Sequence, residues 1–229
     1  RVVNYDRVGY SSVSYAMWLL CRDIMRKPLP ELLAILQKKL ADDDVTFSGY
    51  AVKGRTGIDG LGLNQFSRRY IYHLLARLTE ATEIGAGRTE TFDRLVDRTL
   101  KNPFDIEHIW ADDYEIVKEQ FSTEQEFQDW RNHVASLLLL PADVNRSLQD
   151  KPFPMKRVHY AKQNFFAASL DSSVYEHQPQ FQQFATQYEL PFKFAEVFDK
   201  AEQQVRRKLI AGLVELIWSP NRLCEAAHV

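Results

Sequence analysis

FDIEHIW at residues 104–110 and LLLLPADVNRSL at residues 137–148 are the two segments that decide the fold. Residues 104–110 begin with alternating apolar and polar positions, which predicts a short strand running into a turn. The apolar run Leu137–Leu140 ends at Pro141 and predicts a second, buried strand. Asp143 can cap a helix that starts at residue 144 or 145. The sequence therefore predicts a strand, a loop, a second strand and a helix, in this order.

Helical patterns surround this centre. The clearest is Leu63–Thr82, for which we predict one apolar face. Its apolar positions recur every four residues, at Phe66, Tyr70, Leu74 and Leu78. A long amphipathic helix is predicted over Ala195–Trp218, and two further helices over Ser11–Met25 and from Pro30 onward. With Val45–Val52 as a possible extra strand, the expected fold class is α+β, mostly α-helical with a small embedded strand pair.

Length and composition bound the kind of protein. The 229 residues, 45% of them hydrophobic, suffice for one large domain or two small ones. No run of about 18 apolar residues is present, so we expect no membrane-spanning helix. The chain starts with Arg1 and shows no signal peptide, and we expect a fragment of a longer protein. Cys21 and Cys224 lie too far apart for a CxxC zinc site, and a reducing cytoplasm is the simplest setting.

Charge is distributed unevenly, although the net charge is only −2. Nine acids and one lysine lie between Asp105 and Asp129, whereas five bases and one acid lie between Arg146 and Lys162. An acidic segment beside a basic one suits a cation site that faces a phosphate-contacting surface. For any single one of these side chains, a solvated helix face is the simpler interpretation.

The chemistry in the central stretch suits phosphodiester hydrolysis, which needs a base to deprotonate water and a cation to neutralise charge on the phosphate. His108 is a candidate base because its ordinary pKa lies near neutrality. Glu107 and the amide oxygen of Asn145 are hard ligands suited to Mg²⁺. Three bases that follow can hold phosphates: Lys151, Lys156 and Arg157. An isolated EHI triplet is weak evidence, and a structural histidine beside a surface glutamate is the alternative.

The whole pattern is more specific than its parts. FDIEHIW, then RN-x-x-x-x-LLLLP-x-x-x-N-x-S-x-x-D-x-P-F-x-x-K, then HY-x-x-QN, resembles the C-terminal HNH (His-Me finger, ββα-metal) nuclease domain of GmrSD-type modification-dependent restriction enzymes and SspE-like phage-defence proteins. The resemblance is dense from Phe104 to Tyr175 and looser from Leu63. Together with the helical patterns near the start of the chain, it divides the chain into an N-terminal helical and linker region at 1–62 and a nuclease domain at 63–229. This domain is expected to have a ββα-metal core at about 104–160 and a C-terminal helical part.

The resemblance also implies roles for individual residues. His108 matches the general base, Glu107 the acidic metal ligand, and Asn145 the second metal ligand on the helix. Ser136 stands nine residues before Asn145, where the family often has an Asn that steadies the loop carrying the base. Other positions match recurring or supporting positions of the family: Lys151, Lys156, Asp105, Tyr160 and Gln163.

The implied function is a DNA endonuclease or nickase that uses Mg²⁺ (or Mn²⁺) in a bacterial, cytoplasmic anti-phage system. In such proteins a nucleotide-binding, modification-sensing domain usually precedes the nuclease domain and carries a DGQQR motif, which is absent from this sequence. Two alternatives stay open: a DNA-binding or protein-interaction module whose nuclease site has decayed, and an all-helical structural domain in which EHI is incidental. The sequence leaves the oligomeric state and the targeted DNA modification open.

Overall fold

The computed structural model describes residues 10–42, 57–89, 91–219 and 224–225. It divides into two compact units, one of Arg1–Phe47 with Trp218–Val229 and one of Ser48–Ile217. The sequence-based division at residue 62 stays a prediction, and the possible strand Val45–Val52 lies outside the described residues.

The first unit contains two consecutive helices, α2 (Tyr10–Ile24) and α3 (Leu29–Asp42). Both were predicted from apolar spacing and proline placement. An ion pair of 2.8 Å between the Lys39 ammonium and the Asp23 carboxylate links them. Cys21 and Cys224 are free thiols.

The second unit holds the predicted centre. Strand β1 (Phe104–His108) pairs antiparallel with β2 (Leu137–Pro141), with Glu107 opposite Leu138 and His108 opposite Leu137. Helix α8 (Ala142–Leu148) follows directly and packs on both strands. The mostly helical α+β class is therefore confirmed, as are the two strands and the helix after the second strand. The connection predicted as a loop instead contains α6 (Tyr114–Val117) and α7 (Glu124–Asn132). The leucines of β2 are at most 1% exposed, which explains why the segment forms a strand with both faces covered.

The start of α8 differs from the prediction. The helix begins at Ala142 with Pro141 at its N-cap, so Asp143 lies inside the first turn. Its carboxylate accepts a hydrogen bond from the Val144 N–H at 2.7 Å. Proline has no N–H and a fixed φ, which makes it compatible with a helix start, and the helix thus begins earlier than the Asp cap suggests.

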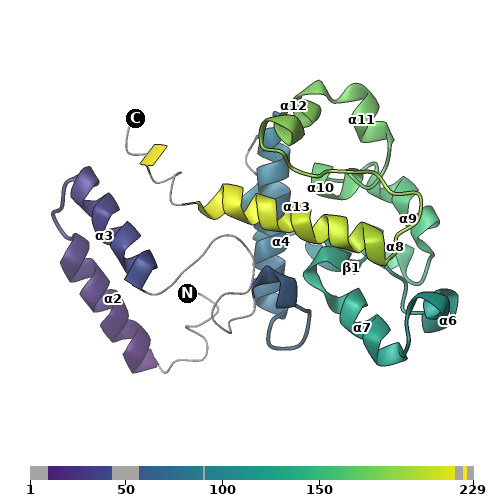
Figure 1. Cartoon of the computed structure of the whole chain (residues 1–229), viewed down its shortest axis with the longest axis horizontal. Helices are drawn as coiled ribbons and strands as arrows, with labels where there is room; N and C mark the ends of the chain where they lie inside the picture. The colour runs from purple at the N-terminus through teal and green to yellow at the C-terminus, as the bar shows by residue number, and fades with distance from the viewer. Residues whose placement is uncertain (1–9, 43–56, 90, 220–223, 226–229) are drawn as a thin grey trace. The chain divides into compact units, whose positions relative to one another are not determined.

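Helix α4 (Arg68–Gly85) crosses beside the small sheet and contacts β2 (Figure 1). The prediction began this helix at Leu63 and placed Phe66 on its apolar face. In the structure Asn64 Oδ1 instead accepts the N–H groups of Phe66 and Ser67, at 2.9 and 3.0 Å. This side-chain turn competes with the helix, so Phe66 precedes α4 and is 76% exposed.

The remaining elements of the second unit cover the sheet and each other. The α-helices are α5 (Phe92–Val96), α6 (Tyr114–Val117), α7 (Glu124–Asn132), α9 (Phe153–Tyr160), α10 (Phe165–Ala168), α11 (Ser173–His177), α12 (Pro179–Gln187) and α13 (Lys200–Trp218). Among its described residues, three short 3₁₀ segments are present, at Ile58–Gly60, Lys118–Gln120 and Val134–Ser136. The yellow helix α13 in Figure 1 is the predicted C-terminal helix and starts five residues later than expected. In the described part of the chain, no helix combines the length and apolar character needed to cross a membrane.

Candidate active site

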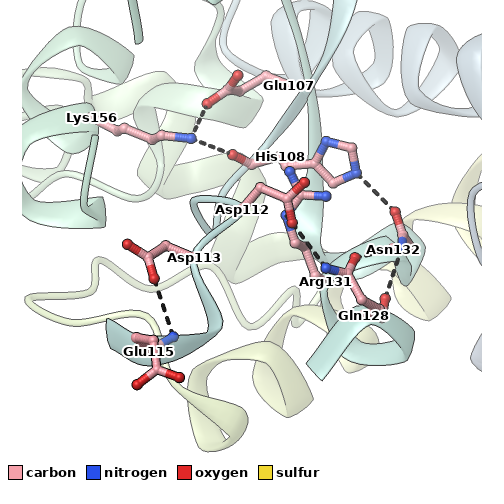
Figure 2. Close-up of polar contacts among 9 residues, drawn as sticks. All are labelled: Glu107, His108, Asp112, Asp113, Glu115, Gln128, Arg131, Asn132 and Lys156. Atoms are coloured by element: carbon pink, nitrogen blue, oxygen red, sulfur yellow. Dashed lines mark hydrogen bonds and ion pairs between the residues drawn. The ribbon is translucent and has the colours of Figure 1, made fainter. Parts of the chain in front are cut away.

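Glu107 lies near the end of β1, and helix α9 holds its carboxylate. Glu107 is 3% exposed. Its Oε1 accepts hydrogen bonds from the Lys156 ammonium and the Tyr160 hydroxyl, each at 2.8 Å. The same ammonium also donates to the His108 carbonyl oxygen at 2.7 Å (Figure 2). Burial raises the pKa of Glu107, and the Lys156 charge opposes that rise. One oxygen of the carboxylate is thus fixed by the protein, and Oε2 is the atom that can meet a ligand.

Lys156 lies in the core, where its ammonium contacts Glu107, and its role as a phosphate contact stays a prediction. Lys156 is 1% exposed and forms its ion pair with Glu107 inside the core. Arg157 is also held by the protein, since its guanidinium donates to the Ala195 carbonyl at 2.9 Å and lies 3.3 Å from the Asp171 carboxylate. Lys151 is half-buried in the turn after α8. The burial of Lys156 follows from its position on the inner face of α9, one turn before Tyr160.

The His108 ring turns toward α7, away from the partners of Glu107. Its Nε2 lies 3.0 Å from Asn132 Oδ1. Asn132 Nδ2 in turn donates to the Gln128 carbonyl at 2.9 Å, so the Asn132 oxygen faces the ring as an acceptor (Figure 2). A neutral imidazole must then carry its proton on Nε2, which leaves the Nδ1 lone pair able to accept a proton.

The surroundings of His108 keep the ring neutral. Burial, together with the positive charge of Arg131, lowers the pKa of His108 from 6.5 to about 4. The hydrogen bond to Asn132 raises the pKa, but it does not offset burial. At neutral pH the imidazole is therefore unprotonated, which is the state that a general base requires.

Ser136 lies beside this arrangement in the 3₁₀ segment before β2 and is fully buried. Its hydroxyl donates to the Trp130 carbonyl at 2.8 Å and accepts from the Gln203 amide at 2.6 Å. Its carbonyl accepts the Ile109 N–H at 2.9 Å. Ser136 thus holds the residue after His108 through its backbone, whereas the partner of the imidazole itself is Asn132. The resemblance assigns the steadying of the base to the position of Ser136, and this assignment stays a prediction.

The sequence motif gave no role to three residues of α7 that lie at this site, Gln128, Arg131 and Asn132. Arg131 and Asn132 form the RN pair of the quoted pattern. The Arg131 side chain is 14% exposed, and its Nε lies 3.6 Å from the Asp112 carboxylate. Gln128 donates to the same carboxylate at 2.9 Å. In the sequence, the presence of Arg131 and Asn132 within the motif was the feature that could have indicated these contacts of α7.

Asn145 is anchored to β1 directly beside Glu107. Its Nδ2 donates to the Ile106 carbonyl at 3.0 Å, and its amide oxygen is the atom that can coordinate a cation. In the described residues, no group of three His, Cys, Asp or Glu side chains could hold a metal ion. The two predicted ligands would offer one carboxylate oxygen and one amide oxygen. Oxygen donors of this kind fit Mg²⁺ or Mn²⁺, since Mg²⁺ takes few protein ligands and keeps several waters.

The predicted supporting residues lie at different depths. Tyr160 is fully buried and holds Glu107, as described above. Asp105 forms an ion pair of 3.3 Å with Arg68, at the start of α4. Gln163 is half-buried, and its backbone N–H donates to the Tyr160 carbonyl at 2.9 Å. Of these three supporting residues, only Tyr160 has a recorded hydrogen bond to a candidate site residue, which is Glu107.

Comparison with known families gives one match. Residues 61–184 match the family described as GmrSD restriction endonucleases, C-terminal domain. The match covers more than half of the chain and includes β1, β2, α8 and α9. No significant match exists among curated proteins or among solved structures.

Proposed function

Because this chain belongs to the family of GmrSD restriction endonuclease C-terminal domains, we propose that its nuclease domain is an HNH-type, metal-dependent DNA endonuclease or nickase. The observation that carries the proposal is the neutral His108, held by Asn132 and adjacent in sequence to a buried carboxylate. A base and a cation ligand in adjacent positions supply the two groups that phosphodiester hydrolysis needs.

His108 acts in this proposal as the general base. Its Nδ1 accepts a proton from water, the water oxygen forms a new bond to phosphorus, and the bond to the leaving 3′ oxygen breaks. Asn132 keeps the ring in the tautomer with Nε2 protonated, so that Nδ1 stays available. The nearby Arg131 charge disfavours the imidazolium that results, which favours release of the proton once the bond has broken.

Glu107 and Asn145 would hold the cation, which when bound neutralises charge on the phosphate. The Lys156 ammonium and the Tyr160 hydroxyl fix the carboxylate through Oε1. Ile106 fixes the amide through its nitrogen. Each ligand is thus oriented by a second contact, which is how proteins maintain ligand geometry. The Lys156 charge reduces the attraction of Glu107 for a cation, so we expect a weak site that needs millimolar Mg²⁺.

Arg131 is a further candidate for binding phosphate. Its charge acts on both His108 and Glu107, so it lies near both groups. Its Nε is buried and lies 3.6 Å from the Asp112 carboxylate, so a phosphate contact would use the terminal nitrogens of the guanidinium. A guanidinium next to the base suits a phosphate oxygen, because its planar fork can donate two N–H groups at once.

The wider setting is also a proposal. DNA is the substrate, and a nucleotide-binding, modification-sensing domain in the same protein directs the nuclease domain in a bacterial cytoplasm. Family membership supports this setting, because the matched family is a C-terminal domain of restriction endonucleases.

One observation favours the alternative of a decayed nuclease site that only binds DNA. The ion pair between Glu107 and Lys156, at 2.8 Å, occupies the carboxylate that a cation would need. The two functions differ in a simple assay, because a decayed domain binds DNA without cutting it in either Mg²⁺ or Mn²⁺.

The test is a Mg²⁺ titration of plasmid cleavage by the parent chain and two variants on α8. Asn145→Ala removes the proposed ligand without leaving a buried charge, and we expect the Mg²⁺ concentration for half-maximal rate to rise about tenfold or more. Ser147→Ala, an exposed position on the same helix, is the matched control and should follow the parent. Equal Mg²⁺ dependence for all three proteins would refute the ligand assignment.

A further inference from the structure

Phe66 is exposed to an unusual degree for an aromatic side chain. At 76%, it is the most exposed large hydrophobic residue in the described part of the chain. The turn that presents it is well fixed, because Asn64 Oδ1 accepts two backbone N–H groups and the Ser67 hydroxyl donates to the Gly62 carbonyl at 2.7 Å. A rigid turn that holds a ring in solvent suggests a contact surface rather than loose packing.

The turn lies next to the candidate active site. The Leu63 N–H donates to the Asn132 carbonyl at 2.7 Å, and the Val134 N–H donates to the Leu61 carbonyl at 2.9 Å. Residue 62 thereby forms an isolated antiparallel bridge with residue 133. Since Asn132 also holds the His108 ring, a single residue connects the turn with the proposed base.

The segment of sequence that carries Phe66 is basic, whereas the whole chain has a net charge of −2. Residues 61–70 contain Arg68 and Arg69 and no acid. Arg68 pairs with Asp105, and because these side chains are 57% and 34% exposed, solvent weakens the pair. The Arg69 guanidinium lies 4.9 Å from the centre of the Tyr70 ring and donates to the Tyr70 hydroxyl at 3.0 Å.

We propose that Asn64–Ser67 and the first turn of α4 form a DNA-contact element, in which the Phe66 ring packs against bases and Arg68 and Arg69 pair with flanking phosphates. An aromatic ring beside cationic side chains is the chemistry that proteins use against bases and backbone. The inference rests on the proposed function, because it assigns how DNA reaches His108. The proposed element changes the affinity for DNA and not the chemical step, because it contains none of the proposed catalytic residues.

Binding is measured by fluorescence anisotropy with a labelled 30-base-pair duplex, using variants made in the His108→Ala chain so that the probe stays intact. Phe66→Ala should weaken binding by about five- to tenfold, because one base–aromatic contact is lost. Phe66→Trp keeps an aromatic face and should bind like the parent. Ile84→Ala is the control, since Ile84 is 46% exposed at the other end of α4 and should have no effect.

Salt dependence tests the two arginines. In a plot of the logarithm of affinity against the logarithm of salt concentration, Arg68→Gln and Arg69→Gln should each reduce the slope by about one. Unchanged slopes in both variants would contradict the phosphate contacts.

The outcomes separate this inference from the proposed function. If Phe66→Ala binds the duplex like the parent, the inference is wrong, and cleavage by the unaltered chain still upholds the nuclease. If Phe66→Ala changes the oligomeric state instead of DNA affinity, the ring is a protein contact and the inference is wrong. A chain with intact His108 that neither binds nor cuts DNA contradicts both.

Discussion

Asn132→Asp is the substitution that most sharply tests how His108 is held. The change replaces the neutral oxygen that lies 3.0 Å from His108 Nε2 with a carboxylate. A carboxylate at hydrogen-bonding distance stabilises the imidazolium, and an opposite charge at such a distance shifts a pKa by about 1 to 3 units. Starting from a pKa of about 4, His108 should then titrate between roughly 5 and 7.

The consequence for catalysis follows from the sign of that shift. A base works in its unprotonated form, so raising its pKa moves the acidic limb of the rate profile to higher pH. The parent chain should cut plasmid at nearly constant rate from pH 8 down to about pH 5. Asn132→Asp should lose about tenfold in rate for each pH unit below its new pKa, while its rate at pH 8 stays within about tenfold of the parent.

The assay is single-turnover plasmid cleavage at saturating Mg²⁺ between pH 4.5 and 8.5. Asn132→Ala is the matched control, because it removes the acceptor without adding charge. We expect it to lower the rate about 10- to 100-fold at all pH values through poorer ring orientation, with its acidic limb near that of the parent. Superimposable profiles for Asn132→Asp and the parent would refute the assignment of Asn132 as the residue that orients the base.

Three further predictions concern the same site. Lys156→Met leaves Glu107 buried without its cationic partner, and we expect a loss of about 3 to 5 kcal/mol in the free energy of unfolding, measured with urea. The double variant Lys156→Met with Glu107→Gln should recover part of this loss, whereas equal stability of Lys156→Met and the parent would contradict the buried pair. The pKa of His108 is about 4 in the folded chain and 6.5 in the unfolded chain. The contribution of His108 to stability is therefore constant above pH 6.5 and falls by about 1 to 3 kcal/mol as the pH drops to 4. His108→Gln should flatten the plot of unfolding free energy against pH in this range, and an unaltered slope would argue against a buried neutral ring. Arg131→Gln should slow single-turnover cleavage about 100-fold, with partial recovery in Arg131→Lys, and a rate equal to the parent would remove Arg131 from the phosphate site.

Local patterns in the sequence predicted the scaffold of the site well. The strand at residues 104–108, the buried strand at 137–141 and the helix after it each depend on residues close in the chain, such as the leucine run and its terminal Pro141. The chemistry of the residue types indicated Glu107, His108 and Asn145 as site residues, and the family resemblance implied the same roles. The structure ties Asn145 to the strand beside Glu107. These features are encoded by short-range preferences and by spacing.

Local sequence patterns could not predict contacts between residues that lie far apart in the sequence. Asn132 lies 24 residues after His108, and Lys156 lies 49 residues after Glu107. A lysine in a basic stretch is usually a surface residue, and only the packing of α9 on β1 shows that Lys156 is buried. Phe66 was misassigned for a local reason, because its four-residue spacing matched the helix while Asn64 formed a competing turn.

The central claim is that His108 activates water for DNA cleavage, and plasmid cleavage in Mg²⁺ by the parent, His108→Ala and His73→Ala tests it most directly. His73 is an exposed histidine on α4, so its variant controls for the loss of an imidazole as such. We predict that His108→Ala cuts about 10²- to 10⁴-fold more slowly than the parent, and that His73→Ala cuts at the parental rate. Cleavage by His108→Ala as fast as by the parent would contradict the account.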